Sequence, residues 1–341
     1  MKRIVLAAML AGAVVPAQAQ PIDRDAVIAQ CDRLAASDYD RDRPPSIAPL
    51  KVEAIDSAAA IPACQAAVRV APDNRRIAFE FGRALHAAKD FEKARAQYRR
   101  ADALGSSVAT NNLAVLFRDG QGGPRDLAEA RRLFEKAAAT GMVVSLYALG
   151  TLHEHGEGVP KDYAEAWRWY EKGAKAGHAG SMGKLGYFSQ NGFAVARDYA
   201  EAMRWYDRAA AAGNAAAMNN IGILYDEGRG VDKDLAEARR WFEKAAAGGN
   251  TSAMFNLGRA YANGNGVPRD DSEARRWYER AANAGHIDAM AALGGLLILG
   301  RGGPADKPAG RRWVEAAAAG GHADAAKLLT ALDREAGRRR R

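Results

Sequence analysis

Apolar residues recur at helical spacing in the second half of the chain, in pairs of short segments that glycines separate. In residues 213–249 the first apolar stripe predicts one helix, called helix A, and the second predicts another, called helix B. The stripes are formed by Met218, Ile221, Leu224 and Tyr225 in helix A and by Ala238, Trp241, Phe242, Ala245 and Ala246 in helix B. Gly228 and Gly230 end helix A, because glycine readily adopts the left-handed conformation of a C-cap. Asp234 and Glu237 form a capping box that opens helix B.

This pattern returns every 36 residues along the chain. The positions that keep the step include Gly105, Gly141, Gly177, Gly213, Gly249, Gly285 and Gly321, and also Trp169, Trp205, Trp241, Trp277 and Trp313. A period of this length indicates one helix-turn-helix unit, which cannot bury its apolar face alone and must stack on its neighbours. The repeat therefore predicts an all-α solenoid rather than a single globular core.

Residues 213–249 also carry a signature that extends beyond the apolar stripes. It consists of Ala217, Ile221, Gly222, Tyr225, Gly228, Gly230, Val231, Asp234, Ala238, Trp241, Phe242, Lys244, Ala245, Ala246 and Gly249. These residues resemble the Sel-one-like repeat (SLR) family of the secreted bacterial type, a relative of the tetratricopeptide repeat. Six units match over residues 106–321. The resemblance implies antiparallel helix pairs coiled into a right-handed α-solenoid with a concave face.

Two positions depart from the signature. The loop of residues 191–195 has Ala194 in place of its second glycine and gains an aromatic residue, Phe193. The last full unit has Gly310 where helix B normally has alanine. We expect altered loop geometry at the first position and a looser helix pair at the second.

The chain outside the repeats divides into further segments. Two helices, Asp23–Ala36 and Glu53–Val70, the second bent at Pro62, form a cap before the repeats. Residues 74–105 show tetratricopeptide spacing, because they lack the glycine loop between their helices. The predicted segments are 1–19, a signal peptide; 20–73, a helical cap with a disulfide; 74–105, a tetratricopeptide-like unit; 106–321, six repeats; 322–337, a closing helix; and 338–341, a basic tail.

The first 19 residues have the pattern of a secretory signal peptide. Lys2 and Arg3 are followed by an apolar run that is too short for a membrane span, and cleavage is expected after Ala19. The alternative is a retained N-terminal anchor. The pattern predicts a periplasmic or secreted protein without an integral membrane segment in the mature chain.

Cys31 and Cys64 are the only cysteines, and both precede the repeats. Because an oxidising compartment favours disulfides, we expect the two to be bridged. Two free thiols, or half of a metal site, are the alternatives.

The formal net charge is +8, and removal of Lys2 and Arg3 with the signal peptide would lower it to +6. Four of these charges lie in the run of residues 338–341, which predicts a solvated end. Nucleic acid is a poor partner for a chain outside the cytoplasm, so we expect none.

No catalytic constellation is recognisable, so we expect neither enzymatic activity nor a cofactor. Ser181 stands at a helix A position that holds alanine in other units, where a small residue packs. His153 and His155 are two residues apart and point to different faces of a helix, which disfavours a metal site. The acidic residues of helix B are expected to form scaffold ion pairs, namely Arg168–Glu171, Arg204–Asp207, Arg240–Glu243 and Arg276–Glu279.

A row of polar residues is the strongest functional signal. Asn112, Lys184, Asn220 and Asn256 occupy one equivalent position of helix A. In tetratricopeptide relatives this position faces the concave groove, where an asparagine can hold a peptide backbone with its donor and its acceptor. The alternative is a merely solvated helix face. The neighbouring variable positions, expected to provide specificity or else inter-repeat packing, are Tyr147, Tyr187, Phe255 and Arg259.

The leading hypothesis is a scaffold that binds a partner protein or peptide on the concave face, and the resemblance adds a role as regulator of an envelope complex. A second hypothesis is a hydrolase acting on cell-wall or beta-lactam substrates. One branch of the family resembles beta-lactamases but carries a disulfide in each repeat, whereas this chain has no cysteine after Cys64. A third hypothesis, a secreted factor that binds host proteins, is not separable from the first by sequence.

Overall fold

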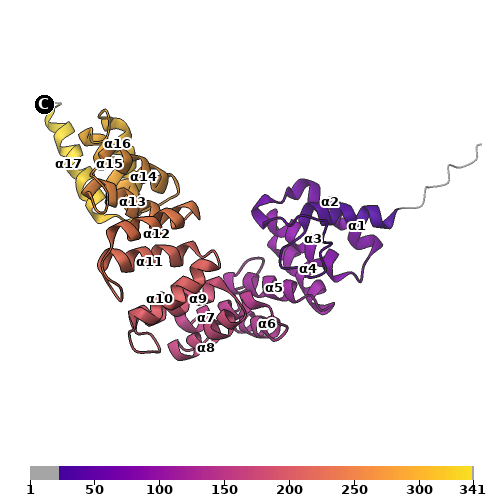
Figure 1. Ribbon diagram of the computed structural model, residues 1–341. Helices are drawn as coiled ribbons and strands as arrows, with labels where there is room; N and C mark the ends of the chain where they lie inside the picture. The colour runs from indigo at the N-terminus through magenta and orange to yellow at the C-terminus, as the bar shows by residue number, and fades with distance from the viewer. Residues whose placement is uncertain (1–22, 340–341) are drawn as a thin grey trace, which may run out of the picture. The chain divides into compact units, whose positions relative to one another are not determined.

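The computed structural model describes residues 23–339, with side chains up to Arg334 (Figure 1). Within this range the chain is all-α, with helices α1 to α17, one short 3-10 helix and no strand. The predicted signal peptide, residues 1–19, lies outside the described residues, as do Arg340 and Arg341 of the predicted tail. None of the helices between residues 23 and 339 is long and apolar enough to cross a membrane.

The chain forms two compact units, residues 1–126 and 127–341. The helices of the first unit are α1 (Arg24–Ala35), η1 (Val52–Ala54), α2 (Ser57–Val70), α3 (Arg75–Ala87), α4 (Phe91–Ala103) and α5 (Ser107–Asp119). The second cap helix begins at Ser57 rather than at Glu53. The reason is Asp56, whose carboxylate accepts the N–H groups of Ala58 and Ala59 and thereby caps α2. Pro62 lies inside α2, which continues past it.

The predicted disulfide is confirmed, because Cys31 of α1 and Cys64 of α2 are bonded and fully buried. A second tie fixes the loop between these helices. Arg83 of α3 is nearly buried and donates to the carbonyl groups of Ala35, Ala36 and Leu50. The guanidinium therefore satisfies three carbonyls that regular secondary structure leaves without partners.

The second unit consists of stacked helix pairs. Its helices are α6 (Leu127–Ala139), α7 (Val143–His155), α8 (Tyr163–Lys175), α9 (Ala179–Asn191), α10 (Tyr199–Ala211), α11 (Ala215–Glu227), α12 (Leu235–Ala247), α13 (Thr251–Asn263), α14 (Asp271–Asn283), α15 (Ile287–Leu299), α16 (Lys307–Ala319) and α17 (Ala323–Arg339). Odd-numbered helices from α7 to α15 are A helices, and even-numbered helices from α8 to α16 are the B helices that follow them. The 36-residue pattern is confirmed as a repeating helix pair.

The expected change of loop geometry at Ala194 does not occur. Ala194 has a φ of 63°, close to the 73° of its equivalent, Gly230, so alanine adopts the left-handed conformation of the glycine loops. Phe193 holds the loop, because its ring stacks on Tyr163 with centroids 4.7 Å apart. Packing therefore imposes a backbone conformation that alanine disfavours.

The expectation of a looser final pair at Gly310 is also wrong. A Cβ atom at Gly310 would lie 2.8 Å from the carbonyl oxygen of Gly294 and 2.7 Å from Ile298. The two glycines thus let α15 and α16 approach each other more closely than an alanine would permit.

Two predictions about helix B need correction. Trp241 is half-buried rather than buried, with Lys244 4.0 Å above its ring, and the core position is that of Phe242. Helix B arginines pair with the acid three residues earlier, as Arg240 does with Glu237 at 2.8 Å. In the predicted capping box, Glu237 would accept the backbone N–H of Asp234. That N–H instead donates to the carbonyl of Tyr225 in helix A, so Glu237 is available to Arg240. The equivalent pairs are Arg132–Glu129, Arg168–Glu165 and Arg276–Glu273.

Candidate functional site

The B helices α8, α10, α12 and α14 each place one large ring against the A helix of their own repeat. The rings belong to Tyr170, Tyr206, Phe242 and Tyr278, all of which are nearly or fully buried. They lie on the repeat glycines Gly150, Gly186, Gly222 and Gly258, where an added Cβ would come within 2.4 to 2.6 Å of the ring. The glycines therefore create the space for the rings, and where the ring is a tyrosine its hydroxyl reaches the side chains of the A helices.

In the first of these repeats the tyrosine hydroxyl meets an ion pair. Tyr170 donates to Oε2 of Glu154, 2.5 Å away, and Oε1 of Glu154 accepts from Lys184 of the next repeat at 2.9 Å. Burial and the bond to Glu154 hold the pKa of Tyr170 far above its usual range. The polar row therefore joins neighbouring A helices, here α7 and α9.

The next repeat has a neutral version of the same contact. Tyr206 donates to Oε1 of Gln190 at 2.8 Å, and Asn220 of the following A helix donates to the same hydroxyl. Burial again raises the pKa of the tyrosine. Lys184 and Asn220 thus play equivalent parts in successive repeats, and each is half-buried.

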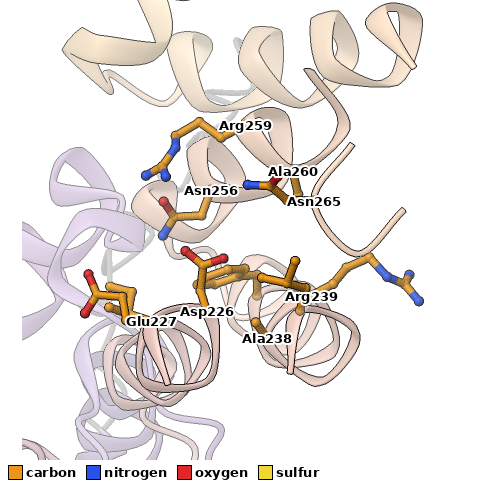
Figure 2. A pocket seen from close by; sticks show the side chains of 11 residues that line it. Asp226, Glu227, Ala238, Arg239, Asn256, Arg259, Ala260 and Asn265 are labelled. Atoms are coloured by element: carbon orange, nitrogen blue, oxygen red, sulfur yellow. The ribbon is translucent and has the colours of Figure 1, made fainter. Parts of the chain in front are cut away.

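The third of these four repeats, residues 215–250, lacks the hydroxyl because its ring is Phe242. Asp226 takes the place of Glu154 and Gln190, and Asn256 that of Lys184 and Asn220. Here a pocket of about 150 Å³ opens between α11, α12 and α13. Figure 2 shows the side chains of Asp226 and Asn256 facing each other across it, with Arg259 on the far side of Asn256. Asn256 also donates to Oδ1 of Asn219 at 3.0 Å.

The predicted site residues fall into three groups. Lys184, Asn220 and Asn256 lie on successive A helices of the second unit and are half-buried. Asn112 belongs to the first unit, where it bonds to the hydroxyl of Tyr98. Among the variable positions, Arg259 and Tyr187 are exposed, the latter by 40%.

The other two variable positions serve as packing between repeats. The Tyr147 ring lies 5.6 Å from that of Tyr170 and 5.2 Å from that of His178. Phe255 stacks on His286 with centroids 4.8 Å apart. A wider pocket of about 440 Å³ lies beside Phe255, with Tyr278, Ala292, His322 and Leu328 among its lining residues.

Sequence reasoning missed the row formed by Glu154, Gln190 and Asp226. A signal was available, since these residues keep the 36-residue step and lie 16 residues before the helix B ring. Comparing that row with the ring positions would have shown that Phe242 alone among these three rings lacks a hydroxyl to offer.

The candidates for chemistry have structural roles. His178 caps α9, because its Nδ1 accepts the N–H of Ser181, whose side chain is fully buried. His286 and His322 cap α15 and α17 in the same way. No group of three or more histidine, cysteine or acidic residues that could hold a metal ion occurs in the described part of the chain.

The Sel1 repeat family matches six consecutive stretches of the sequence, residues 107–141, 143–178, 179–214, 215–250, 251–286 and 287–322. The chain belongs to the Sel1 repeat family, whose members typically mediate protein–protein interaction and are generally not enzymes. The comparison with curated proteins gave no match.

Solved structures agree with this assignment. A Sel1 repeat protein from Oxalobacter formigenes is 34% identical with a TM-score of 0.67, and the match covers 71% of this chain and 99% of that one. The protective antigen c5321 of uropathogenic Escherichia coli, which displays an SLR fold, is 29% identical with a TM-score of 0.63, over 77% of this chain and 57% of that one. Yeast Tom70, 12% identical with a TM-score of 0.55, covers 94% of this chain and 66% of its own and shares the fold alone.

Proposed function

We propose that this protein is a periplasmic or secreted scaffold that binds a partner protein or peptide on its A-helix face. This face is the surface formed by the A helices of successive repeats and carries Lys184, Asn220, Asn256, Tyr187 and Arg259. It corresponds to the concave face that the repeat family implies. Asn112 occupies the same repeat position in the first unit.

The observation that carries the proposal is the polar row on these helices. Side chains on neighbouring A helices exchange hydrogen bonds at Glu154–Lys184 and Asn219–Asn256, so donors and acceptors are held in fixed places along the repeats. Exposed groups next to them, such as Arg259, remain free to contact a partner. An extended peptide needs regularly placed donors and acceptors of this kind.

Location outside the cytoplasm rests on two features. The N-terminal residues have the pattern of a signal peptide. Cys31 and Cys64 form a disulfide, a bond that persists mainly in oxidising compartments. Both features support export, and an exported scaffold would meet its partner in the envelope or beyond it.

Capture of partners from a native envelope extract tests the proposal. The triple variant Asn112→Ala, Asn220→Ala, Asn256→Ala should capture the native partner at least tenfold less well, since each lost hydrogen bond contributes about 1 kcal/mol. Because these asparagines also form hydrogen bonds within the protein, the melting temperature of the triple variant is measured alongside its capture of the partner. Arg259→Gln is the matched variant, because Arg259 is exposed and its change should weaken capture without altering melting.

Deleting residues 338–341 is the control for non-specific charge. The deletion should change the salt dependence of capture but not the identity of the partner. If the triple variant and Arg259→Gln both capture the partner as well as the parent does, the A-helix face is not the binding surface.

A further inference from the structure

The surroundings of Asp226 differ from the equivalent positions in the two preceding repeats by the loss of a hydrogen-bond donor. There, the acceptors Glu154 and Gln190 each receive a hydrogen bond from a tyrosine hydroxyl. At the third position the ring is Phe242, which has no hydroxyl to donate. The carboxylate of Asp226 therefore faces a space that a donor fills in the neighbouring repeats, and the pocket of about 150 Å³ occupies that space.

The charges around the pocket identify what fits there. Glu227 pairs with Arg229 at 3.0 Å, and Arg239 pairs with Glu243 at 2.5 Å, so both are already engaged. Within the described residues, Asp226 has neither an ion pair nor a hydrogen-bond donor. It is half-buried, and a carboxylate held away from water is stabilised by a cationic donor.

The remaining walls suit the same ligand. Phe242 is 5% exposed and contributes an aromatic surface, to which cations are attracted. One N–H of the Asn256 amide donates to Asn219, and Figure 2 shows the Asn256 side chain beside Asp226 with its oxygen on the side of Arg259. The volume admits the end of one long side chain rather than a folded segment.

We propose that this pocket binds the cationic end of a lysine or arginine side chain. The partner that presents it is the one bound on the A-helix face, so the biological role of the pocket rests on the proposed function. The cation donates to Asp226 and packs on Phe242. Arg259 at the rim opposes the cation by charge but contacts another part of the same partner, so its loss should strengthen binding of a free cation and weaken capture of the partner.

Nuclear magnetic resonance of the full chain tests the proposal with small probes. Nα-acetyl-arginine N-methylamide and its lysine counterpart are titrated while the side-chain amide signals of Asn256 are followed. Saturable shifts at millimolar probe are expected. Asp226→Asn should weaken binding at least fivefold, and Arg259→Gln should strengthen it about twofold, because the two changes have opposite effects on the charge of the pocket.

Phe242→Tyr is the sharpest variant. It supplies the hydroxyl that the neighbouring repeats possess, which should donate to Asp226 in place of the cation and weaken probe binding at least fivefold while the fold is retained. Asp232→Asn is the matched control, since it removes an exposed loop carboxylate outside the pocket and should leave the shifts unchanged.

The proposal is overturned if Nα-acetyl-glutamate N-methylamide shifts the Asn256 signals and the cationic probes do not. It is equally overturned if the cationic probes shift the Asn256 signals in Asp226→Asn and in Phe242→Tyr to the same extent as in the parent protein. The proposed function is judged separately by partner capture. Probe binding without any effect of the face variants on capture contradicts the function alone, and capture through the face without probe binding contradicts the pocket alone.

Discussion

Tyr170 and Glu154 form a buried hydrogen bond of 2.5 Å between the two helices of one repeat, and Glu154 also holds Lys184 of the next repeat. The bond connects helix A to helix B at the hydroxyl end of the buried Tyr170 ring. Lys184 then passes the connection to the neighbouring repeat. Stability of the second unit should therefore depend on this one hydroxyl.

We expect Tyr170→Phe to lower the free energy of unfolding by about 1.5–3 kcal/mol, since a hydrogen bond to a charged group is lost and Glu154 stays buried. The matched comparison is Tyr170→Phe in a Glu154→Gln background, where the acceptor is neutral and the substitution should cost about 1 kcal/mol. Urea unfolding of both variants measures the difference. Equal costs would mean that the charge of Glu154 plays no part.

Ala194→Gly should stabilise the protein by about 0.5–1 kcal/mol. Alanine at a φ of 63° adopts a left-handed conformation that is unfavourable for it and that glycine adopts freely. Removing this strain should outweigh the destabilisation caused by the larger backbone entropy of glycine in the unfolded chain. The mirror variant Gly230→Ala should destabilise by more than 1 kcal/mol, because its Cβ would lie 2.5 Å from the Cβ of Tyr199. Thermal melting of the pair checks both signs. A lower melting temperature for Ala194→Gly would refute the strain argument.

The repeat architecture was predictable because its signals are local. The glycine C-caps, the Asp N-caps and the apolar stripes each act within one unit, and the 36-residue step repeats them. The conformation at Ala194 was not predictable, because it is imposed by the stacking of Phe193 on Tyr163 from the preceding repeat. A missing glycine alone suggests a changed loop.

The candidate site shows the same division. The helix A position of Asn220 and Asn256 was predictable from the step, but their half-buried state was not. Asn256 bonds to Asn219 on another A helix, a partner that depends on how two repeats pack. The pocket at Asp226 likewise arises from the combination of three residues on three helices, and no single one of them signals it.

In the first unit, Glu80 gives a pH prediction. Burial, and then repulsion by the nearby Asp32, raise the pKa of Glu80 to about 9. The folded state therefore keeps a proton that the unfolded chain releases near the usual glutamate pKa of about 4.3. The contribution of Glu80 to stability is complete below that pH and is lost progressively as the pH rises to about 9.

Glu80→Gln cannot titrate and should remove this dependence. The melting temperature of the parent, relative to that of Glu80→Gln, should fall between pH 5 and pH 9, with a slope in free energy of up to about 1.4 kcal/mol per pH unit. Calorimetry at several pH values gives the comparison. A constant difference between the two proteins across this range would show that Glu80 is ionised when folded.

Site-specific photo-crosslinking in the native host tests most directly whether a partner binds on the A-helix face. A photoreactive phenylalanine analogue replaces Tyr187, which is 40% exposed on this face, and in a second strain replaces Arg204, which is exposed on helix B. We expect a discrete crosslinked product with a partner protein from position 187 and none from position 204. The same product from position 204, with none from position 187, would contradict it.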